Sequence, residues 1–84
     1  MRSEQRLAAF LLSLSQRLAA LGYSPSEFIM RMSREELGNY LGLTLETVSR
    51  LFSRFAREGV IIVNQREIKI TDMAALNELV GKPC

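Results

Sequence analysis

The segment that decides the fold is SREELGNYLGLTLETVSRLFSRFAREG, at residues 33–59. Ser33 followed by Glu36 three positions later is a capping box, in which each side chain accepts a hydrogen bond from the other residue's backbone amide. Gly42 is suited to end the short helix that begins there. Thr44 can then cap a second helix. Two short helices joined by a tight glycine turn predict a helix-turn-helix.

The spacing within this segment favours two helices that cross closely. Gly38 precedes Gly42 by four positions, and a small residue there lets the neighbouring helix approach. Apolar residues on both sides of the turn can supply core contacts: Leu37, Leu41, Leu43, Val48 and Leu51. A large or charged residue at Gly38 or Val48 is expected to force the helices apart.

The second helix, predicted at residues 45–58, has two different faces. Successive residues of a helix turn by about 100°. One face therefore gathers apolar side chains: Val48, Leu51, Phe52 and Phe55. The other carries Glu46, Ser49, Arg50, Ser53 and Arg57. In a helix-turn-helix this outer face of the second helix enters the major groove of DNA, with its first residues nearest the base edges.

The residue types on the outer face suit DNA recognition. Arg50 offers a planar fork for guanine O6 and N7, and Glu46 can accept a hydrogen bond from a cytosine amino group. Ser49 can bond either kind of base or pack near a thymine methyl group. We therefore expect base contacts from these three residues. Phosphate contacts are expected further along the helix, from Ser53, Arg54 and Arg57.

The charged side chains of this helix have two interpretations, namely DNA contacts and surface ion pairs. Glu46 and Arg50 lie four positions apart, so they could form only an exposed ion pair. The helix-turn-helix context favours base contact for them. Arg54 and Glu58 have the same spacing, and for these two a surface ion pair and a phosphate contact both stay open.

A helix and a brief strand are predicted before this segment. Residues 3–22 repeat apolar side chains at steps of three, four and seven, which predicts an amphipathic helix capped by Ser3 and ended by Gly22. The alternation in EFIMRM, residues 27–32, predicts a short strand.

Two strand-like runs and a short helix are predicted after it. VIIVN at 60–64 and EIKIT at 67–71 are separated by Gln65 and Arg66, which predicts a β-hairpin although the turn lacks the usual glycine. Asp72 can cap a final short helix. This order predicts a winged helix-turn-helix, mostly α with a small β-hairpin. Its helix-turn-helix is expected at about 34–58 and its wing at about 60–71.

Composition limits the functions that this chain can have. Its 84 residues, 48% of them apolar, allow one compact domain over 1–84, and the net charge of +2 is compatible with a polyanionic partner. The chain has no histidine, and Cys84, expected to be an inert chain end, is its only cysteine. We therefore expect no intrachain disulfide, metal site, cofactor or enzyme activity here. No apolar run is long enough to span a membrane, which favours a cytoplasmic protein.

A known family shares these motifs. The run SREELGNYLGLTLETVSRLFSRF, with QRLAAFLLSLSQR before it and the hairpin after it, resembles the C-terminal DNA-binding domain of the Crp/Fnr transcription regulators of bacteria. The pattern of Glu46, Ser49 and Arg50 is similar to the FNR branch. The CRP branch has an arginine just before the glutamate and a glycine just before the final arginine, where this chain has Leu45 and Ser49.

The resemblance implies roles for individual residues. Glu46 and Arg50 would contact the G·C pair of a TTGAT-type half-site, and Ser49 would help to select the neighbouring T·A pair. Residues at family positions that hold the phosphate backbone are Ser33, Arg34, Thr44 and Thr47. Gln65 and Arg66 lie at the expected wing tip, where Arg66 would contact a phosphate.

The resemblance also implies partners beyond DNA. Family members carry an N-terminal sensor domain and a long dimerisation helix, so the chain is expected to be a fragment of a longer, homodimeric regulator. The loop GYSPSEF at 22–28 matches a region that activators of the family use against RNA polymerase, although its turn residues also fit a plain connector. A winged helix that contacts only proteins is the alternative function. Such a domain should carry apolar residues on the outer face.

Overall fold

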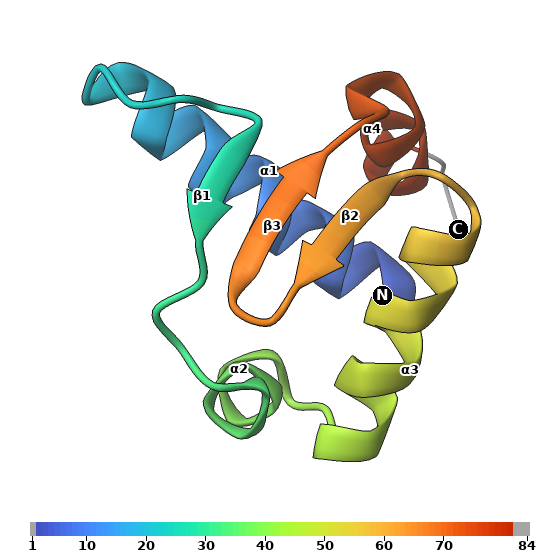
Figure 1. Ribbon diagram of the computed structural model, residues 1–84. Helices are drawn as coiled ribbons and strands as arrows, with labels where there is room; N and C mark the ends of the chain where they lie inside the picture. The colour runs from blue at the N-terminus through green and yellow to red at the C-terminus, as the bar shows by residue number, and fades with distance from the viewer. Residues whose placement is uncertain (1, 82–84) are drawn as a thin grey trace.

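The structure is a computed structural model that describes residues 2–81; Cys84 lies outside the described residues. The described part of the chain forms a winged helix-turn-helix of mostly helical character, as predicted (Figure 1). Its elements in chain order are α1 (Ser3–Ala20), β1 (Glu27–Ile29), α2 (Arg34–Leu41), α3 (Leu45–Arg57), β2 (Ile61–Asn64), β3 (Glu67–Ile70) and α4 (Met73–Gly81).

The sheet has three antiparallel strands in the order β1-β3-β2. The predicted hairpin forms β2 and β3, and β1 pairs with the free edge of β3, with Phe28 opposite Ile68. The strand predicted at 27–32 is shorter than expected and ends at Ile29. It ends there because Ile29 lies opposite Glu67, the first residue of β3, and the residues before Glu67 form the hairpin turn.

The hairpin turn contains no glycine, and Gln65 adopts the positive φ that a glycine would otherwise supply. This residue has a φ of 57° and is the only non-glycine residue with positive φ in the described range 2–81. The first central position of a two-residue hairpin turn requires positive φ. Gln65 therefore takes the conformation that asparagine or glycine usually supplies.

The predicted helix caps are present around the helix-turn-helix. The Glu36 backbone amide donates to Ser33 Oγ (3.1 Å), and the Ser33 amide donates to Glu36 Oε1 (2.9 Å). Gly42 ends α2 in the left-handed region, with φ of 75°. The Thr47 amide donates to Thr44 Oγ1 (3.1 Å) at the start of α3. Local sequence thus fixes both ends of α2 and the start of α3.

The remaining helix starts include one confirmed cap and one correction. Asp72 caps α4 as predicted, because its Oδ1 accepts a hydrogen bond from the Ala75 amide (3.0 Å). Ser3 is not the N-cap of α1: it is the first helical residue, and Arg2 occupies the N-cap position. Gln5 Oε1 accepts from the Arg2 amide (3.0 Å), so a side chain three residues later bonds the N-cap amide.

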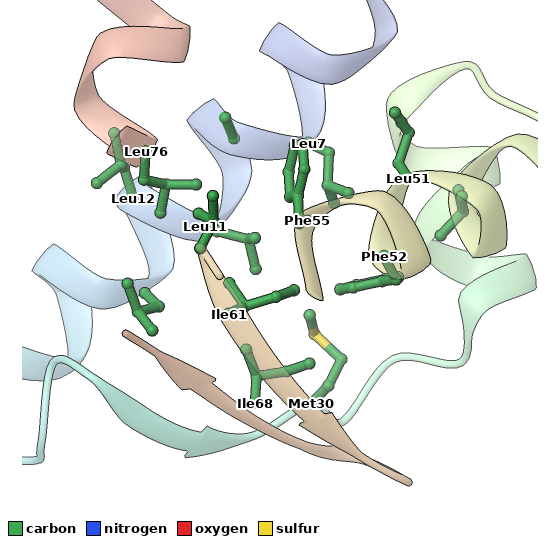
Figure 2. Packing of buried hydrophobic residues seen from close by; sticks show 14 of the residues in the cluster. Leu7, Leu11, Leu12, Met30, Leu51, Phe52, Phe55, Ile61, Ile68 and Leu76 are labelled. Atoms are coloured by element: carbon green, nitrogen blue, oxygen red, sulfur yellow. The ribbon is translucent and has the colours of Figure 1, made fainter. Parts of the chain in front are cut away.

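The hydrophobic core lies between α1, α3, the sheet and α4. Figure 2 shows side chains from all of these elements pointing into one cluster. Its largest fully buried members are Leu7, Leu11, Val48, Phe55, Ile61 and Leu76, together with Leu37 from α2. Because α3 turns one apolar face into this cluster, its polar face must point outward.

At Gly38, α2 packs closely against the backbone of the turn that follows it. A Cβ atom placed on Gly38 would lie 2.6 Å from the backbone oxygen of Leu43. The predicted close packing is present, but the nearest neighbour is the turn's backbone and not a side chain of the second helix. A backbone oxygen cannot rotate away as a side chain could, so the position demands glycine.

Candidate nucleic-acid interface

The outer face of α3 forms a shallow groove. The residues that line it are Leu45, Glu46, Ser49, Arg50, Ser53 and Arg57. The opposite face is buried, with Val48 and Phe55 fully excluded from solvent. The predicted division of this helix into an apolar and a polar face is therefore confirmed. In Figure 1, α3 forms one flank of the molecule, so its outer face is open to a large partner.

Glu46 and Arg50 carry the strongest hydrogen-bonding groups of this groove. Both side chains are exposed. Within residues 2–81 neither makes an ion pair or a side-chain hydrogen bond, so the exposed pair considered as an alternative does not form. Ser49 lies half-buried beside them. The three residues expected to contact bases thus share one groove, with their polar groups available to a partner.

Hydroxyl groups stand at the N-terminal ends of both helices of the motif. Thr44 Oγ1 and Thr47 Oγ1 are 2.8 Å apart, and Ser33 Oγ accepts the amide hydrogen bond of its capping box. One of the two threonine hydroxyl groups donates its proton to the other, and the second hydroxyl group keeps its own proton for a hydrogen bond to a partner. A helix N-terminus also carries partial positive charge. Together these groups can bind an anion such as a phosphate.

The wing tip lies beside the start of α2. Ser33, Arg34, Gln65 and Arg66 line one small pocket, although about thirty residues separate the two segments. The Arg34 guanidinium stacks over the Phe52 ring, 5.1 Å from its centroid, which holds the charge at the surface. The hydrogen bond from the Ser33 backbone amide is the main cause that lowers the pKa of Glu36, and the nearby charge of Arg66 adds to it.

Arg54 differs from the other arginines of this helix. Its Nε donates to Glu58 Oε2 (3.3 Å), and its Nη1 contacts Glu4 Oε2 of α1. The hydrogen bond with Glu58, followed by the charges of Glu4 and Glu58, raises the pKa of the Arg54 guanidinium. Arg54 is also absent from the residues that line the outer groove. Of the two interpretations left open by the sequence, the ion pair with Glu58 is formed.

Leu45 belongs to the groove and was not among the predicted contact residues. It is the first residue of α3, it is 47% exposed, and it lies in the groove beside Glu46. An apolar side chain at this place can pack against a thymine methyl group. The available signal was its position directly after the capping residue Thr44, at the end of the second helix that in helix-turn-helix motifs generally lies nearest the bases.

The loop at 22–28 is organised by its own hydrogen bonds. Ser24 Oγ accepts from the backbone amides of Ser26 (3.3 Å) and Glu27 (3.2 Å), and Ser15 Oγ donates to the Pro25 oxygen (2.6 Å). These bonds account for the turn composition of the loop. A contact between this loop and RNA polymerase stays a prediction.

The described range 2–81 contains neither a membrane-spanning helix nor a cluster of metal ligands. No helix there has the length and apolar character that crossing a membrane requires. No group of three or more metal-ligating side chains gathers there either.

Known proteins share both the sequence and the fold. Residues 5–79 match the family of Crp-like helix-turn-helix domains. The chain is 73% identical over 82 residues to the transcriptional regulatory protein btr of Bordetella pertussis, covering 98% of this chain and 34% of that protein. It is 49% identical over 79 residues to the fumarate and nitrate reduction regulatory protein of Escherichia coli K12, covering 94% and 32%. The chain thus spans about a third of the length of these relatives, which are regulators and not enzymes.

Solved structures agree with this assignment. FixK2 from Bradyrhizobium japonicum matches with a TM-score of 0.84 and 33% identity, over 99% of this chain and 40% of that one. A CRP/FNR-family regulator from Thermus thermophilus matches with a TM-score of 0.75 and 28% identity, over 98% and 42%. Its capped helix pair, its wing and these relatives show that the chain belongs to the Crp-like helix-turn-helix domains of the Crp/Fnr transcription regulators.

Proposed function

We propose that this domain binds double-stranded DNA in a sequence-specific manner, with the outer face of α3 in the major groove. The observation that carries the proposal is the groove on this face, where Glu46 and Arg50 are exposed and have no partner within residues 2–81. Unpaired hydrogen-bonding groups on an exposed recognition helix suit base edges, which offer fixed donors and acceptors.

The proposed target is a TTGAT-type half-site. Arg50 donates two hydrogen bonds to the guanine, and Glu46 accepts one from the amino group of its paired cytosine. Ser49 contacts the neighbouring T·A pair, and Leu45 packs against a thymine methyl group. This arrangement follows from the family pattern and from the four residues' shared groove.

Phosphate contacts surround this groove in the proposed complex. The residues assigned to them are Ser33, Arg34, Thr44, Thr47, Ser53, Arg57 and Arg66. Support comes from the hydroxyl groups at the helix N-termini and from the stacked position of Arg34. These contacts set the orientation of the domain and make binding salt-dependent, with a log–log slope of about −0.9 for each phosphate neutralised.

The whole protein is proposed to be a homodimeric bacterial regulator that works in the cytoplasm, where the chromosome lies. Relatives named as an anaerobic regulatory protein and as a fumarate and nitrate reduction regulatory protein suggest a regulator of anaerobic metabolism, with its sensor outside this domain. No cofactor is assigned to the domain itself.

The deciding experiment compares Arg50→Ala with Arg57→Ala. If Arg50 binds the guanine, its removal should weaken binding to a TTGAT-type duplex by roughly 5- to 150-fold, equivalent to about 1–3 kcal/mol, and relax the preference for that G·C pair. Binding to an unrelated duplex should change much less. Arg57→Ala removes the same charge and should weaken binding to both duplexes alike.

Competition assays with duplexes altered at single base pairs supply the measurement. If Arg50→Ala keeps the parent's base preference, α3 does not recognise the half-site in the proposed way. If the parent chain binds no duplex at all, a domain that contacts only proteins becomes the better interpretation.

A further inference from the structure

The first turns of α1 hold the helix-turn-helix through two polar contacts. Glu4 contacts Arg54 of α3, and Arg6 Nη1 donates to the backbone oxygen of Leu41 at the end of α2 (3.1 Å). Both helices of the motif are thus fastened to one element that lies outside it. Only the contact with Glu4 engages a charged side chain of the recognition helix.

The charges around Arg54 sum to a negative cluster. Arg54 contributes one positive charge, while Glu4 and Glu58 contribute two negative charges. The Glu4 side chain is 22% exposed, against 46% for Arg54 and 49% for Glu58, so Glu4 is the most sheltered from solvent. A sheltered carboxylate is screened less by salt, and a three-membered network is more persistent than an isolated surface pair.

The position of Arg54 separates it from the DNA-facing arginines. Arg50 and Arg57 line the outer groove, whereas Arg54 points to the flank that faces α1. A phosphate that approached Arg54 would have to displace both carboxylates or accept repulsion from them.

We infer that Glu4 is a positioning residue that keeps Arg54 off the DNA backbone. This inference rests on the proposed DNA-binding function. By holding Arg54 against α1, Glu4 removes one cation from those that could neutralise phosphates. The sequence-independent part of the affinity is therefore smaller than the number of arginines on α3 would give.

The test measures salt dependence for four chains: the parent, Glu4→Gln, Arg54→Gln and the double variant. Affinity for an unrelated duplex is followed from low to moderate salt. Arg54→Gln should leave the log–log slope of the parent unchanged. Glu4→Gln should make the slope steeper by up to about 0.9, because Arg54, then paired only with the exposed Glu58, can neutralise one phosphate. In the double variant this gain should disappear.

Glu78→Gln is the matched control for net charge. Glu78 is an exposed carboxylate on α4. Its substitution by Gln removes one negative charge, as Glu4→Gln does, but it does not release an arginine. Thermal unfolding of each variant reports the structural role of the Glu4 contact separately from the slope.

Two outcomes would overturn the inference. A slope reduced by about 0.9 in Arg54→Gln alone would mean that Arg54 already contacts a phosphate. A Glu4→Gln slope equal to that of Glu78→Gln would mean that Glu4 only stabilises the fold. Failure of the proposed function looks different, because the parent itself would then show no binding to duplexes.

Discussion

Gly38 and Gly81 are helical glycines with opposite surroundings, and they allow a test of packing at single residues. A Cβ on Gly38 would lie 2.6 Å from the Leu43 backbone oxygen, whereas one on Gly81 would meet nothing within 4 Å. We expect Gly38→Ala to lower the free energy of unfolding by roughly 1–3 kcal/mol, because the turn must shift to admit the methyl group. Gly81→Ala should be neutral or slightly stabilising, since alanine favours helix more than glycine does.

Urea denaturation of the two variants and the parent supplies the comparison. Equal stability of Gly38→Ala and the parent would show that the turn relaxes freely around residue 38. DNA affinity of Gly38→Ala should fall as well, because the same turn sets the angle of α3 relative to α2.

Single residues also show where sequence analysis reaches its limit. Arg50 and Arg54 are both arginines on the same helix, four positions apart, and the sequence predicted a base contact for Arg50 but left Arg54 between a phosphate contact and an ion pair with Glu58. The structure separates them because Glu4, fifty positions before Arg54, lies next to it in the fold. Such a partner cannot be found from local spacing, which is why the sequence alone left the role of Arg54 open.

At the scale of elements, the features fixed by nearby residues were predicted well. The capping box of α2, the glycine at its end and the Thr44 cap of α3 each depend on residues within four positions of one another. The same locality made the two faces of α3 predictable from helical periodicity.

Elements fixed by distant partners were predicted incompletely. β1 was expected as a short strand, but its pairing with β3 joins Phe28 to Ile68, forty positions along the chain. Its end was misplaced because the start of its partner strand, at Glu67 opposite Ile29, decides where pairing stops. The N-cap of α1 moved by one residue because the Gln5 side chain bonds the Arg2 amide.

Two substitutions in the recognition helix should change the half-site that the domain prefers. Replacing Leu45 by Arg and Ser49 by Gly restores the CRP pattern around an unchanged Glu46 and Arg50. Leu45 and Ser49 line the same groove, so an arginine at 45 is placed to reach a second guanine. We expect the preference to shift from TTGAT-type toward TGTGA-type half-sites. The substitution at Leu45 should scarcely change stability, because Leu45 is 47% exposed, whereas glycine at position 49 inside α3 should cost about 0.5 kcal/mol in helix propensity.

Selection from randomised duplexes, with each protein fused to a dimerising partner, measures this shift. Leu45→Ala with Ser49→Ala is the control, since it removes the same two side chains without adding a guanidinium. If both double variants select the same half-site, the new arginine does not determine the preference.

At the scale of the whole molecule, the core and the proposed DNA surface are separate. The core gathers side chains from the helices and the sheet, while the groove on α3 contributes none of its fully buried members. Substitutions in the groove can therefore change recognition without unfolding the domain.

The dimensions of the domain suit binding in pairs. Its principal extents are 31 × 29 × 23 Å. Half-sites that repeat once per helical turn lie about 34–36 Å apart, a spacing comparable to these extents, which suits two copies on successive major grooves of one side of DNA. Nothing in residues 2–81 resembles the long dimerisation helix expected for the family, since the longest helix, α1, packs into the core of its own domain.

We therefore expect the 84-residue chain to bind a palindrome as independent copies, and two copies joined by a coiled coil to bind it far more tightly. Linking converts the second binding event into an intramolecular one, which can raise affinity by about 10²–10⁴-fold. The gain should vanish when about five base pairs are inserted between the half-sites, because this insertion turns the second groove to the far side of the duplex. Titration of linked and unlinked proteins on both duplexes measures it, with sedimentation confirming that the unlinked chain is monomeric. Cooperative binding by the unlinked chain would show that the domain carries a dimer contact of its own.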